Sequence, residues 1–136
     1  ALLIVDADHF KRINDTFGHP VGDVALMKIA SALTTPLREG DISGRIGGEE
    51  CATFLIGADI QEAQRVAQRL RRSVEEMDFR TPSGEIVRLT VSIGGAMADR
   101  HRSLGDLMGQ ADACLYEAKR SGRNRVTIER DLVVAA

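Results

Sequence analysis

Residues 41–57, DISGRIGGEECATFLIG, contain two strand-like runs on either side of the four residues GGEE. This pattern predicts a β-hairpin, in which glycine supplies the positive φ angles that a two-residue turn demands. The turn also carries two adjacent carboxylates, Glu49 and Glu50, whose like charges repel each other. Such a pair at a tight turn requires either full exposure to water or a compensating positive charge.

The segment before the hairpin predicts one strand and two helices. Residues 1–5 form a short, continuous apolar run that ends at Asp6, which is typical of a strand buried on both faces. A short helix is expected from residue 8 to about residue 17. Apolar residues recur at helical spacing between residues 26 and 37, with a proline near the end, and predict a second helix.

The segment after the hairpin predicts a helix, a strand, a helix and a final strand. Asp59 resembles the first residue of a capping box, and the apolar residues of 60–77 repeat as in an amphipathic helix. Apolar and polar residues alternate between residues 86 and 98, which predicts a half-buried strand. Ser103 is expected to cap the next helix, and a last strand is expected at about residues 125–128.

The order of these elements predicts a single α+β domain over residues 1–136, of the split β-α-β-β-α-β kind, with helices packed on a largely antiparallel sheet. The chain starts inside a strand, so we interpret the domain as cropped at its N-terminal end. If the first strand pairs beside the hairpin, Asp6 comes close to the turn that carries Glu49 and Glu50. Three carboxylates would then share one rim of the sheet.

Three clustered carboxylates are costly unless a cation binds among them. Carboxylates favour hard cations such as Mg²⁺, which usually takes one or two protein ligands and leaves its other positions to water and substrate phosphates. The cluster therefore implies a nucleoside triphosphate. The alternative is that Glu49 and Glu50 are two solvated turn residues and that Asp6 caps the helix that follows it. The sequence contains neither a complete EF-hand loop nor a phosphate-binding P-loop.

The composition excludes several other classes of function. The net charge of −2 provides no basic field of the kind that holds a nucleic acid polymer. No apolar run approaches the roughly 18 residues of a membrane span, so no membrane contact by this domain is expected. Cys51 and Cys114 lie far apart without C-x-x-C spacing, which indicates neither a zinc site nor a disulfide framework and favours the cytoplasm. Whether the full protein is membrane-anchored is left open.

Four blocks of the sequence resemble successive motifs of the GGDEF domain, the diguanylate cyclase family of bacterial signalling. In chain order they read DADHFKRINDTFGHPVGD, RIGGEE, LTVSIGGA and ADACLYEAKRSGRNRV, and the signature itself is the variant GGEEC. The resemblance covers nearly the whole chain. It implies a palm-type fold, similar to nucleotidyl cyclases and polymerases, and a nucleotidyltransferase that joins two GTP molecules into cyclic di-GMP and releases two pyrophosphates.

The resemblance also implies the metal site and the catalytic residues. Two Mg²⁺ ions are expected in each active half-site, with Mn²⁺ as an alternative. Their implied ligands are Asp6, the backbone carbonyl of Ala7, Glu49 and Glu50. Glu49 is also the family's proposed general base for the ribose 3′-hydroxyl, and Lys11 would stabilise charge that develops on the phosphates. On its own, Lys11 would be read as part of a solvated helix face.

Substrate-binding residues are implied in three groups. They are Lys119 and Arg123 for the phosphates, Asn14 and Asp23 for guanine, and Gly47 and Gly48 for close approach of the backbone to the nucleotide. A carboxylate accepts hydrogen bonds from guanine N1–H and N2–H₂, which adenine does not offer in that arrangement. Without the resemblance, the guanine pair would be read as helix caps and the lysine as a charge that complements a helix dipole.

A product-inhibition site is implied by REGD, residues 38–41, which matches the family's R-x-x-D motif. Arg38 can form a fork onto guanine O6 and N7 while Asp41 accepts from the donor edge. Arg69 lies where the family often has an auxiliary arginine for the same ligand. The alternative for Arg38 and Asp41 is a plain surface ion pair.

Three departures from the family pattern are evident. Position 51 is Cys where the signature usually has Phe, and position 46 is Ile where Tyr is common. Both side chains are expected to face inward, so the smaller groups could leave a cavity that costs a few kcal/mol, on the order seen for large-to-small core substitutions. The family's lead-in segment before the first strand is also absent.

The sequence therefore predicts a diguanylate cyclase. The reaction would be metal-assisted attack of a ribose 3′-hydroxyl on an α-phosphate across a homodimer, with GTP as substrate and cyclic di-GMP as product and inhibitor. An upstream sensor domain is expected in the full protein. The alternative is a catalytically lapsed GGDEF domain that senses GTP or cyclic di-GMP, and a weaker one is a purely structural dimerisation domain.

Overall fold

A computed structural model of the chain describes residues 1–129, so the expected domain boundary at residue 136 lies outside the described residues. Strands and helices follow the predicted order. They are β1 (Leu2–Ala7), α1 (Phe10–Phe17), α2 (His19–Thr34), β2 (Ile42–Gly47), β3 (Glu50–Phe54), α3 (Ile60–Glu75), β4 (Val91–Ala96), α4 (Leu104–Arg120) and β5 (Val126–Ile128). In this part of the chain, no helix has the length and apolarity that a membrane span requires.

The five strands form one sheet in the order β2-β3-β1-β4-β5. β1 pairs antiparallel with β3 and with β4, β2 pairs antiparallel with β3, and β4 pairs parallel with β5. The predicted α+β fold, its largely antiparallel sheet and the place of the first strand beside the hairpin are thus confirmed. All six residues of β1 are buried, as the continuous apolar run predicts.

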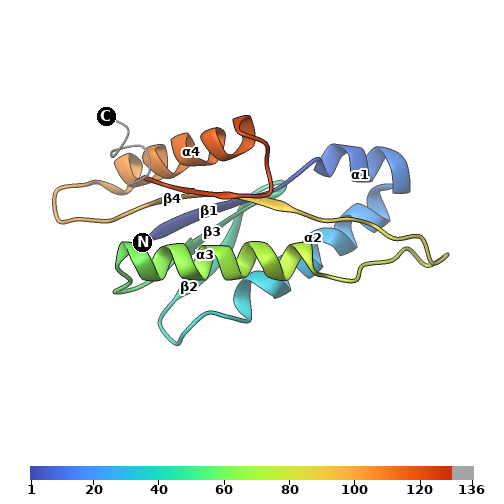
Figure 1. Ribbon diagram of the computed structural model, residues 1–136, viewed down its shortest axis with the longest axis horizontal. Helices are drawn as coiled ribbons and strands as arrows, with labels where there is room; N and C mark the ends of the chain where they lie inside the picture. The colour runs from blue at the N-terminus through green and yellow to red at the C-terminus, as the bar shows by residue number, and fades with distance from the viewer. Residues whose placement is uncertain (130–136) are drawn as a thin grey trace.

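Helices cover both faces of the sheet, with α4 on one face and α3 and α2 on the other (Figure 1). Leu3 and Val5 of β1 pack into the larger core cluster, which includes residues of α2 and α3. Leu2 and Ile4 point to the opposite face and pack with residues of α4. Because side chains alternate along a strand, Asp6 continues the face that α4 covers. The carboxylate at the end of β1 is therefore directed toward the last helix.

Helix termini agree with the capping signals in the sequence. The side chain of Asp59 accepts from the backbone N–H of Glu62 at the start of α3. Ser103 and Asp106 form a complete capping box at the start of α4. At the other end of α4, Gly122 has a φ of +129°, which stops the helix because glycine lacks a Cβ.

Three local predictions are wrong: the length of the strand at residues 86–98, its half-buried character, and the positive φ angles of the turn glycines. The paired strand extends only from Val91 to Ala96. All six of its residues are buried, because helices cover both faces of the sheet. Val87 and Leu89 are still buried, although they lie before the ladder. Gly47 and Gly48 are absent from the residues with positive φ, since the hairpin pairing shifts register near this point.

The expected inward orientation of the two departing residues holds for one of them. Cys51 is half-buried and packs against the larger core cluster. Ile46 is 49% exposed, so the prediction that it faces inward is wrong. The reason is that β2 is the edge strand of the sheet and is exposed over most of its length. A tyrosine at position 46 would therefore extend the surface rather than fill the core.

Arg102 and Glu129 form a partly buried ion pair that joins the loop before α4 to the residue after β5. The Arg102 Nη1 donates to Glu129 Oε2 at 2.6 Å, and Gln110 and the backbone N–H of Met97 donate to the same carboxylate. Glu129 is only 8% exposed. The hydrogen bond from Arg102 is the main reason that the pKa of Glu129 lies below its ordinary value.

We expect Arg102→Ala to lower the free energy of unfolding at pH 7, because a buried carboxylate loses its partner. A depressed pKa stabilises the fold above the pKa of the unfolded chain, and this contribution is lost as the pH falls through the folded-state pKa. The difference between wild type and variant should thus shrink in acid. Urea titrations at pH 7 and at a series of lower pH values that passes through the folded-state pKa of Glu129 measure it. A pH-independent difference would show that the ion pair does not contribute in this way.

Candidate functional site

The end of β1 lies against the hairpin turn. Asp6 is directly opposite Glu50 in the antiparallel pairing, so their side chains share one face of the sheet. The backbone N–H of Ala7 donates to the carbonyl oxygen of Glu49 at 3.3 Å. The predicted approach of Asp6 to the acidic turn is confirmed. An acidic rim, defined here as Asp6, Glu49 and Glu50, therefore lies where β1 meets the β2–β3 turn.

Asp6 is the buried member of the acidic rim. Its residue exposure is 5%, and its Oδ2 forms an ion pair with the ammonium group of Lys119 from α4. Its Oδ1 is buried without a hydrogen-bond partner among the described residues. Burial raises the pKa of Asp6 above its ordinary value, and the nearby Glu49 and Asp8 add to this, although Lys119 opposes the shift.

Glu50 shares this environment to a smaller degree. Partial burial is the first cause that raises its pKa, and the charges of Asp6 and Asp112 raise it further. Glu49 lies in the turn and is exposed, yet its charge contributes to the raised pKa values of both neighbours. The three carboxylates therefore interact electrostatically, and any cation that binds among them would relieve their mutual repulsion.

The residues of the rim fit a divalent cation. A buried carboxylate oxygen without a partner is costly, and a cation is the group that most directly satisfies it. Carboxylate and carbonyl oxygens are also the ligands that Mg²⁺ prefers. Within residues 1–129, no three acidic, histidine or cysteine side chains are arranged to hold a metal ion by themselves.

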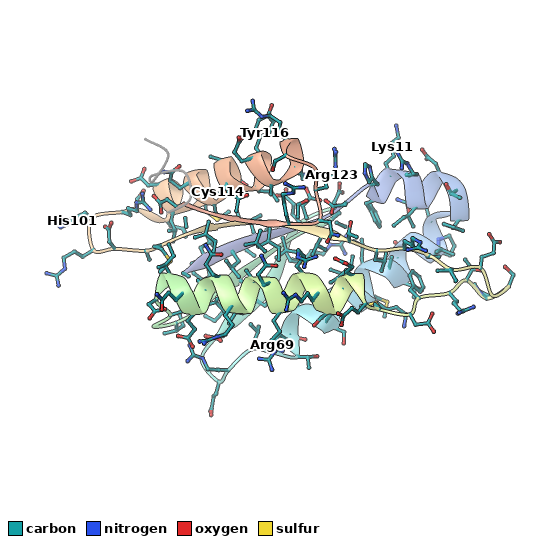
Figure 2. All side chains as sticks on the ribbon, viewed as in Figure 1. Lys11, Arg69, His101, Cys114, Tyr116 and Arg123 are labelled. Carbon is teal, nitrogen blue, oxygen red and sulfur yellow. The ribbon has the colours of Figure 1, made fainter. Side chains whose placement is uncertain are left out.

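The three basic side chains expected to bind phosphate come from α1, from α4 and from the loop after α4. Lys119 contacts Asp6 directly. Lys11 on α1 and Arg123 after α4 are exposed, and Figure 2 shows Arg123 in the region between the end of α4 and α1, with Lys11 on the outer side of α1. Among the described residues, neither Lys11 nor Arg123 has a side-chain hydrogen bond or an ion pair, so both can bind an anionic ligand.

A cavity of about 310 Å³ lies on the other side of the turn, between α2 and the hairpin. Its polar lining includes Asp23, Glu49 and the backbone of Gly48, and its apolar lining includes Met27 and Cys51. A Cβ built at Gly47 or Gly48 would meet no atom within 4 Å, so the turn is open to an approaching ligand. Burial raises the pKa of the Cys51 thiol above its ordinary value, although the charge of Arg45 opposes this shift.

Asn14 lies against Gly22 rather than in the cavity lining. A Cβ at Gly22 would lie 1.7 Å from the Asn14 Oδ1, so α1 and α2 touch at this point because position 22 has no side chain. Asn14 on α1 thus contacts Gly22, the residue directly before Asp23 on α2. The two residues expected to recognise guanine come from adjacent helices and lie near each other.

The residues of the predicted product-inhibition site surround a separate pocket of about 200 Å³. Arg38, Asp41 and Arg69 all line it, together with Glu62. Arg38 Nη1 forms an ion pair with Glu62 at 3.0 Å, and Asp41 accepts from the backbone N–H groups of Arg38 and Ile56. The pocket thus offers arginine side chains to a ligand, while the aspartate is engaged by the local turn.

Asp8 is a second buried carboxylate next to Asp6, and its charge contributes to the raised pKa of Asp6. It is 5% exposed and accepts from the hydroxyls of Thr90 at 2.8 Å and Ser92 at 2.6 Å, and from the backbone N–H of Asn124 at 3.0 Å. The signal was present as Asp-x-Asp at the end of the buried strand. The partners of Asp8 are more than 80 residues away in the sequence, so local patterns do not predict them.

The fold and the acidic rim define an α+β domain of the palm-like cyclase class. Within this class, the chain belongs to the GGDEF family: the family model described as "Diguanylate cyclase, GGDEF domain" matches residues 1–125. Diguanylate cyclase DosC of Escherichia coli strain K12 is 42% identical over 128 residues. That match covers 94% of this chain but only 28% of the relative, so the chain spans about a quarter of the relative's length.

Solved structures agree with this assignment. The GGDEF domain of DgcB from Caulobacter crescentus, in complex with c-di-GMP, superimposes with a TM-score of 0.91 and 34% identity, over 95% of this chain and 77% of that chain. A structure described as the active GGEEF domain of a diguanylate cyclase from Vibrio cholerae has a TM-score of 0.85 and 31% identity, over 94% and 81% of the two chains. GGDEF cyclases generally use divalent metal ions.

Proposed function

We propose that this domain condenses two GTP molecules into cyclic di-GMP and two pyrophosphates. The observation that carries the proposal is the acidic rim, in which Asp6 lies opposite Glu50. One buried oxygen of the Asp6 carboxylate has no partner within residues 1–129, and Lys119 pairs with the other. Membership of the GGDEF family supports the same reaction. The domain described as active in Vibrio cholerae has a GGEEF signature, which supports activity with a glutamate at the third signature position.

In this mechanism the acidic rim binds the metal ions and the basic side chains bind the phosphates. Asp6, the Ala7 carbonyl, Glu49 and Glu50 would hold Mg²⁺ or Mn²⁺, which when bound neutralises triphosphate charge and makes the attacking hydroxyl more acidic. Glu49 is exposed at the turn, where it can reach a ribose 3′-hydroxyl and accept its proton. We propose two ions in each half-site.

Charge on the phosphates is stabilised by basic side chains. We assign Lys11, Lys119 and Arg123 to this role, because Lys119 contacts Asp6 and the exposed side chains of Lys11 and Arg123 form no hydrogen bond or ion pair among the described residues. Lys119 is paired with Asp6 in the free protein, so binding of a cation at Asp6 would release its ammonium group for a phosphate. The cation would thus replace the ammonium group of Lys119 as the positive charge next to Asp6.

Guanine recognition is assigned to Asn14 and Asp23. Their proximity across α1 and α2, together with the cavity that Asp23 lines beside the turn, supports a base seated next to the acidic rim. A carboxylate accepts from the N1–H and N2–H₂ of guanine, and adenine would leave it unpaired. The domain should therefore prefer GTP to ATP.

Catalysis requires two domains, because each holds one GTP and the two nucleotides must attack each other. A homodimer with two-fold symmetry meets this requirement. We also propose that cyclic di-GMP inhibits the enzyme at the pocket lined by Arg38, Asp41 and Arg69. In the full protein, an upstream sensor domain would control dimerisation, and the domain itself would work in the cytoplasm.

The decisive experiment is incubation of the purified protein with GTP and Mg²⁺, followed by mass spectrometry of the products. We expect cyclic di-GMP and pyrophosphate. With ATP in place of GTP, we expect neither a cyclic dinucleotide nor pyrophosphate. The oligomeric state is measured on the same sample. A demonstrably dimeric sample that forms no product would count heavily against the proposal.

The second candidate is a lapsed GGDEF domain that senses GTP or cyclic di-GMP. The observation that favours it is Cys51, which lines the cavity beside the turn where the family signature usually has Phe. We expect Cys51→Phe to change product formation by less than about tenfold, because the thiol contributes no ligand and a volume change costs roughly 1–3 kcal/mol in packing. A silent wild type that this substitution activates would identify a lapsed enzyme. A purely structural domain would bind neither nucleotide in calorimetry.

Gly22→Ala should weaken GTP binding through Asn14. The new Cβ would lie 1.7 Å from the Asn14 Oδ1, so the side chain that recognises guanine must move. We expect the Kd for GTP to rise about tenfold, the value of one or two hydrogen bonds to the base. The free energy of unfolding should change little, because the helix preference of alanine over glycine, about 1 kcal/mol, offsets the cost of displacing the Asn14 side chain. Calorimetry measures the affinity, and an unchanged Kd would remove Asn14 from base recognition.

A further inference from the structure

The loop between α4 and β5 contains three consecutive residues with positive φ angles, a conformation that requires specific contacts to stabilise it. Gly122, Arg123 and Asn124 have φ angles of 129°, 62° and 48°. Left-handed conformations are unfavourable for residues with a side chain, although asparagine tolerates them better than arginine does. The Arg123 N–H donates to the Ala118 carbonyl at 3.0 Å, which closes the end of α4. Two consecutive non-glycine residues in this region persist only where their surroundings fix them.

Asn124 supplies the contacts that fix this loop. Its backbone N–H donates to Asp8 Oδ2 at 3.0 Å, and its Nδ2 donates to Glu75 Oε2 at 2.9 Å. Its Oδ1 accepts from Arg71 Nη1, also at 2.9 Å. One residue therefore joins the loop to the end of β1 and to helix α3. These three bonds hold the loop through both the backbone amide and the side-chain carboxamide.

Both anchors of Asn124 are themselves held. Asp8 is buried and accepts two hydroxyl groups from the β4 region. Arg71 and Glu75 pair with each other along α3, and Arg71 also donates to Gln68 at 3.0 Å. The loop is thus attached to fixed points on both sides. A loop held in this way keeps its conformation before any ligand arrives.

We propose that Asn124 is a positioning residue that holds Arg123 ready for the triphosphate. The inference rests on the proposed function, in which Arg123 contacts the phosphates. The guanidinium of Arg123 has no hydrogen bond or ion pair within residues 1–129, so the backbone that Asn124 fixes is what directs this side chain. A loop that is already ordered avoids the entropy cost of ordering on binding. Asn124 itself does not touch the ligand.

Asn124→Gly tests the proposal, because glycine accepts a positive φ and keeps the backbone N–H to Asp8, while both side-chain bonds are lost. The probes are the GTP analogue with a methylene bridge between the α- and β-phosphates, which the reaction cannot cleave, and guanosine. With Mg²⁺ present, calorimetry should show an affinity for the analogue about tenfold weaker than wild type, and an affinity for guanosine within about twofold. Ser73→Ala is the matched control on α3, since its hydroxyl donates to the Arg69 carbonyl and has no other hydrogen-bond partner within residues 1–129.

A rescue experiment removes the possibility that the loop is merely destabilised. Asn124→Asp places a carboxylate beside Glu75, so binding of the analogue should weaken as with Asn124→Gly. With Glu75→Gln added, the amide of residue 75 can donate to the carboxylate of residue 124, which restores the bond with donor and acceptor exchanged. The carboxylate at position 124 still accepts from Arg71. We expect the double variant to bind the analogue within about threefold of wild type. This pair of variants also decides the question if Asn124→Gly does not fold.

The proposal is overturned if Asn124→Gly binds the analogue as tightly as wild type. It is also overturned if the affinities for the analogue and for guanosine fall equally, since that indicates a general structural role, or if Glu75→Gln gives no rescue. A wild-type protein that does not bind the analogue would refute the proposed function itself. The two failures are therefore distinguishable.

Discussion

Asp6→Asn is expected to abolish formation of cyclic di-GMP without destabilising the protein. The substitution keeps the shape of the side chain but removes the charge that a divalent cation requires. A group that stabilises transition-state charge contributes about 10²- to 10³-fold in rate, and loss of a metal ligand should reach the upper end of this range. Turnover of GTP, measured as pyrophosphate release at saturating Mg²⁺, provides the value.

The stability of this variant distinguishes a functional residue from a structural one. The pKa of Asp6 is raised mainly by burial, so the folded state disfavours the charged form. Stability from such a group is fully present below the pKa of the unfolded chain and is lost as the pH rises through the raised folded-state pKa. At pH 7 the charge of Asp6 is therefore a cost in the absence of metal. Asparagine removes this cost, and the free energy of unfolding should stay the same or rise.

Asp112→Asn is the matched control for this prediction. Asp112 is an exposed carboxylate on α4 that acts electrostatically on Glu50 but has no assigned role as a ligand. Its loss should change turnover by no more than about threefold, as expected for an exposed charge. If Asp6→Asn were as active as this control, the acidic rim would not be the metal site and the catalytic proposal would be wrong.

Gly94→Ala is expected to cause the largest loss of stability of any single substitution considered. A Cβ at Gly94 would lie 2.2 Å from the Leu115 backbone nitrogen and 2.3 Å from the Ala111 carbonyl oxygen. These are backbone atoms of α4, so no side-chain rotation can relieve the clash, and the helix must move away from β4. Overpacking of a tightly packed site costs about 1–3 kcal/mol and occasionally more. We expect about 3 kcal/mol or more here, because a helix backbone must move.

Urea unfolding followed by circular dichroism measures this loss. Gly109→Ala is the control in the same helix, since a Cβ there meets no atom within 4 Å. It should stabilise the protein by about 0.5–1 kcal/mol, the helix preference of alanine over glycine. A Gly94→Ala protein as stable as wild type would mean that β4 and α4 are not in backbone contact. Because α4 also carries Lys119, the variant should lose activity under conditions where it still folds.

Much of the fold could be predicted from local patterns. The apolar run of β1, the capping signals at Asp59 and Ser103, and the periodicity of α3 and α4 each depend on neighbouring residues, and the structure confirms them. The start of β4 was predicted too early, because alternation continues through Val87 and Leu89 although the paired ladder begins later. Pairing depends on a partner strand, which alternation alone does not reveal.

The candidate site divides in the same way. The approach of Asp6 to the hairpin turn could be predicted, because a buried first strand next to a hairpin leaves few places for its last carboxylate. The contact of Asp6 with Lys119 could not be predicted from local patterns, since these residues are 113 positions apart. The bonds of Asp8 and Asn124 were missed for the same reason.

Local patterns in the chain predict the type and order of the elements, the acidic turn and the GGDEF resemblance, because periodicity, caps and motifs are properties of adjacent residues. Three features are visible only in the folded protein: which oxygen of Asp6 is paired, how closely α4 approaches Gly94, and the bonds by which Asn124 joins the α4–β5 loop to α3. These features depend on the packing distances between whole elements. Such distances result from the combined shapes of many side chains, and no local segment of the sequence specifies them.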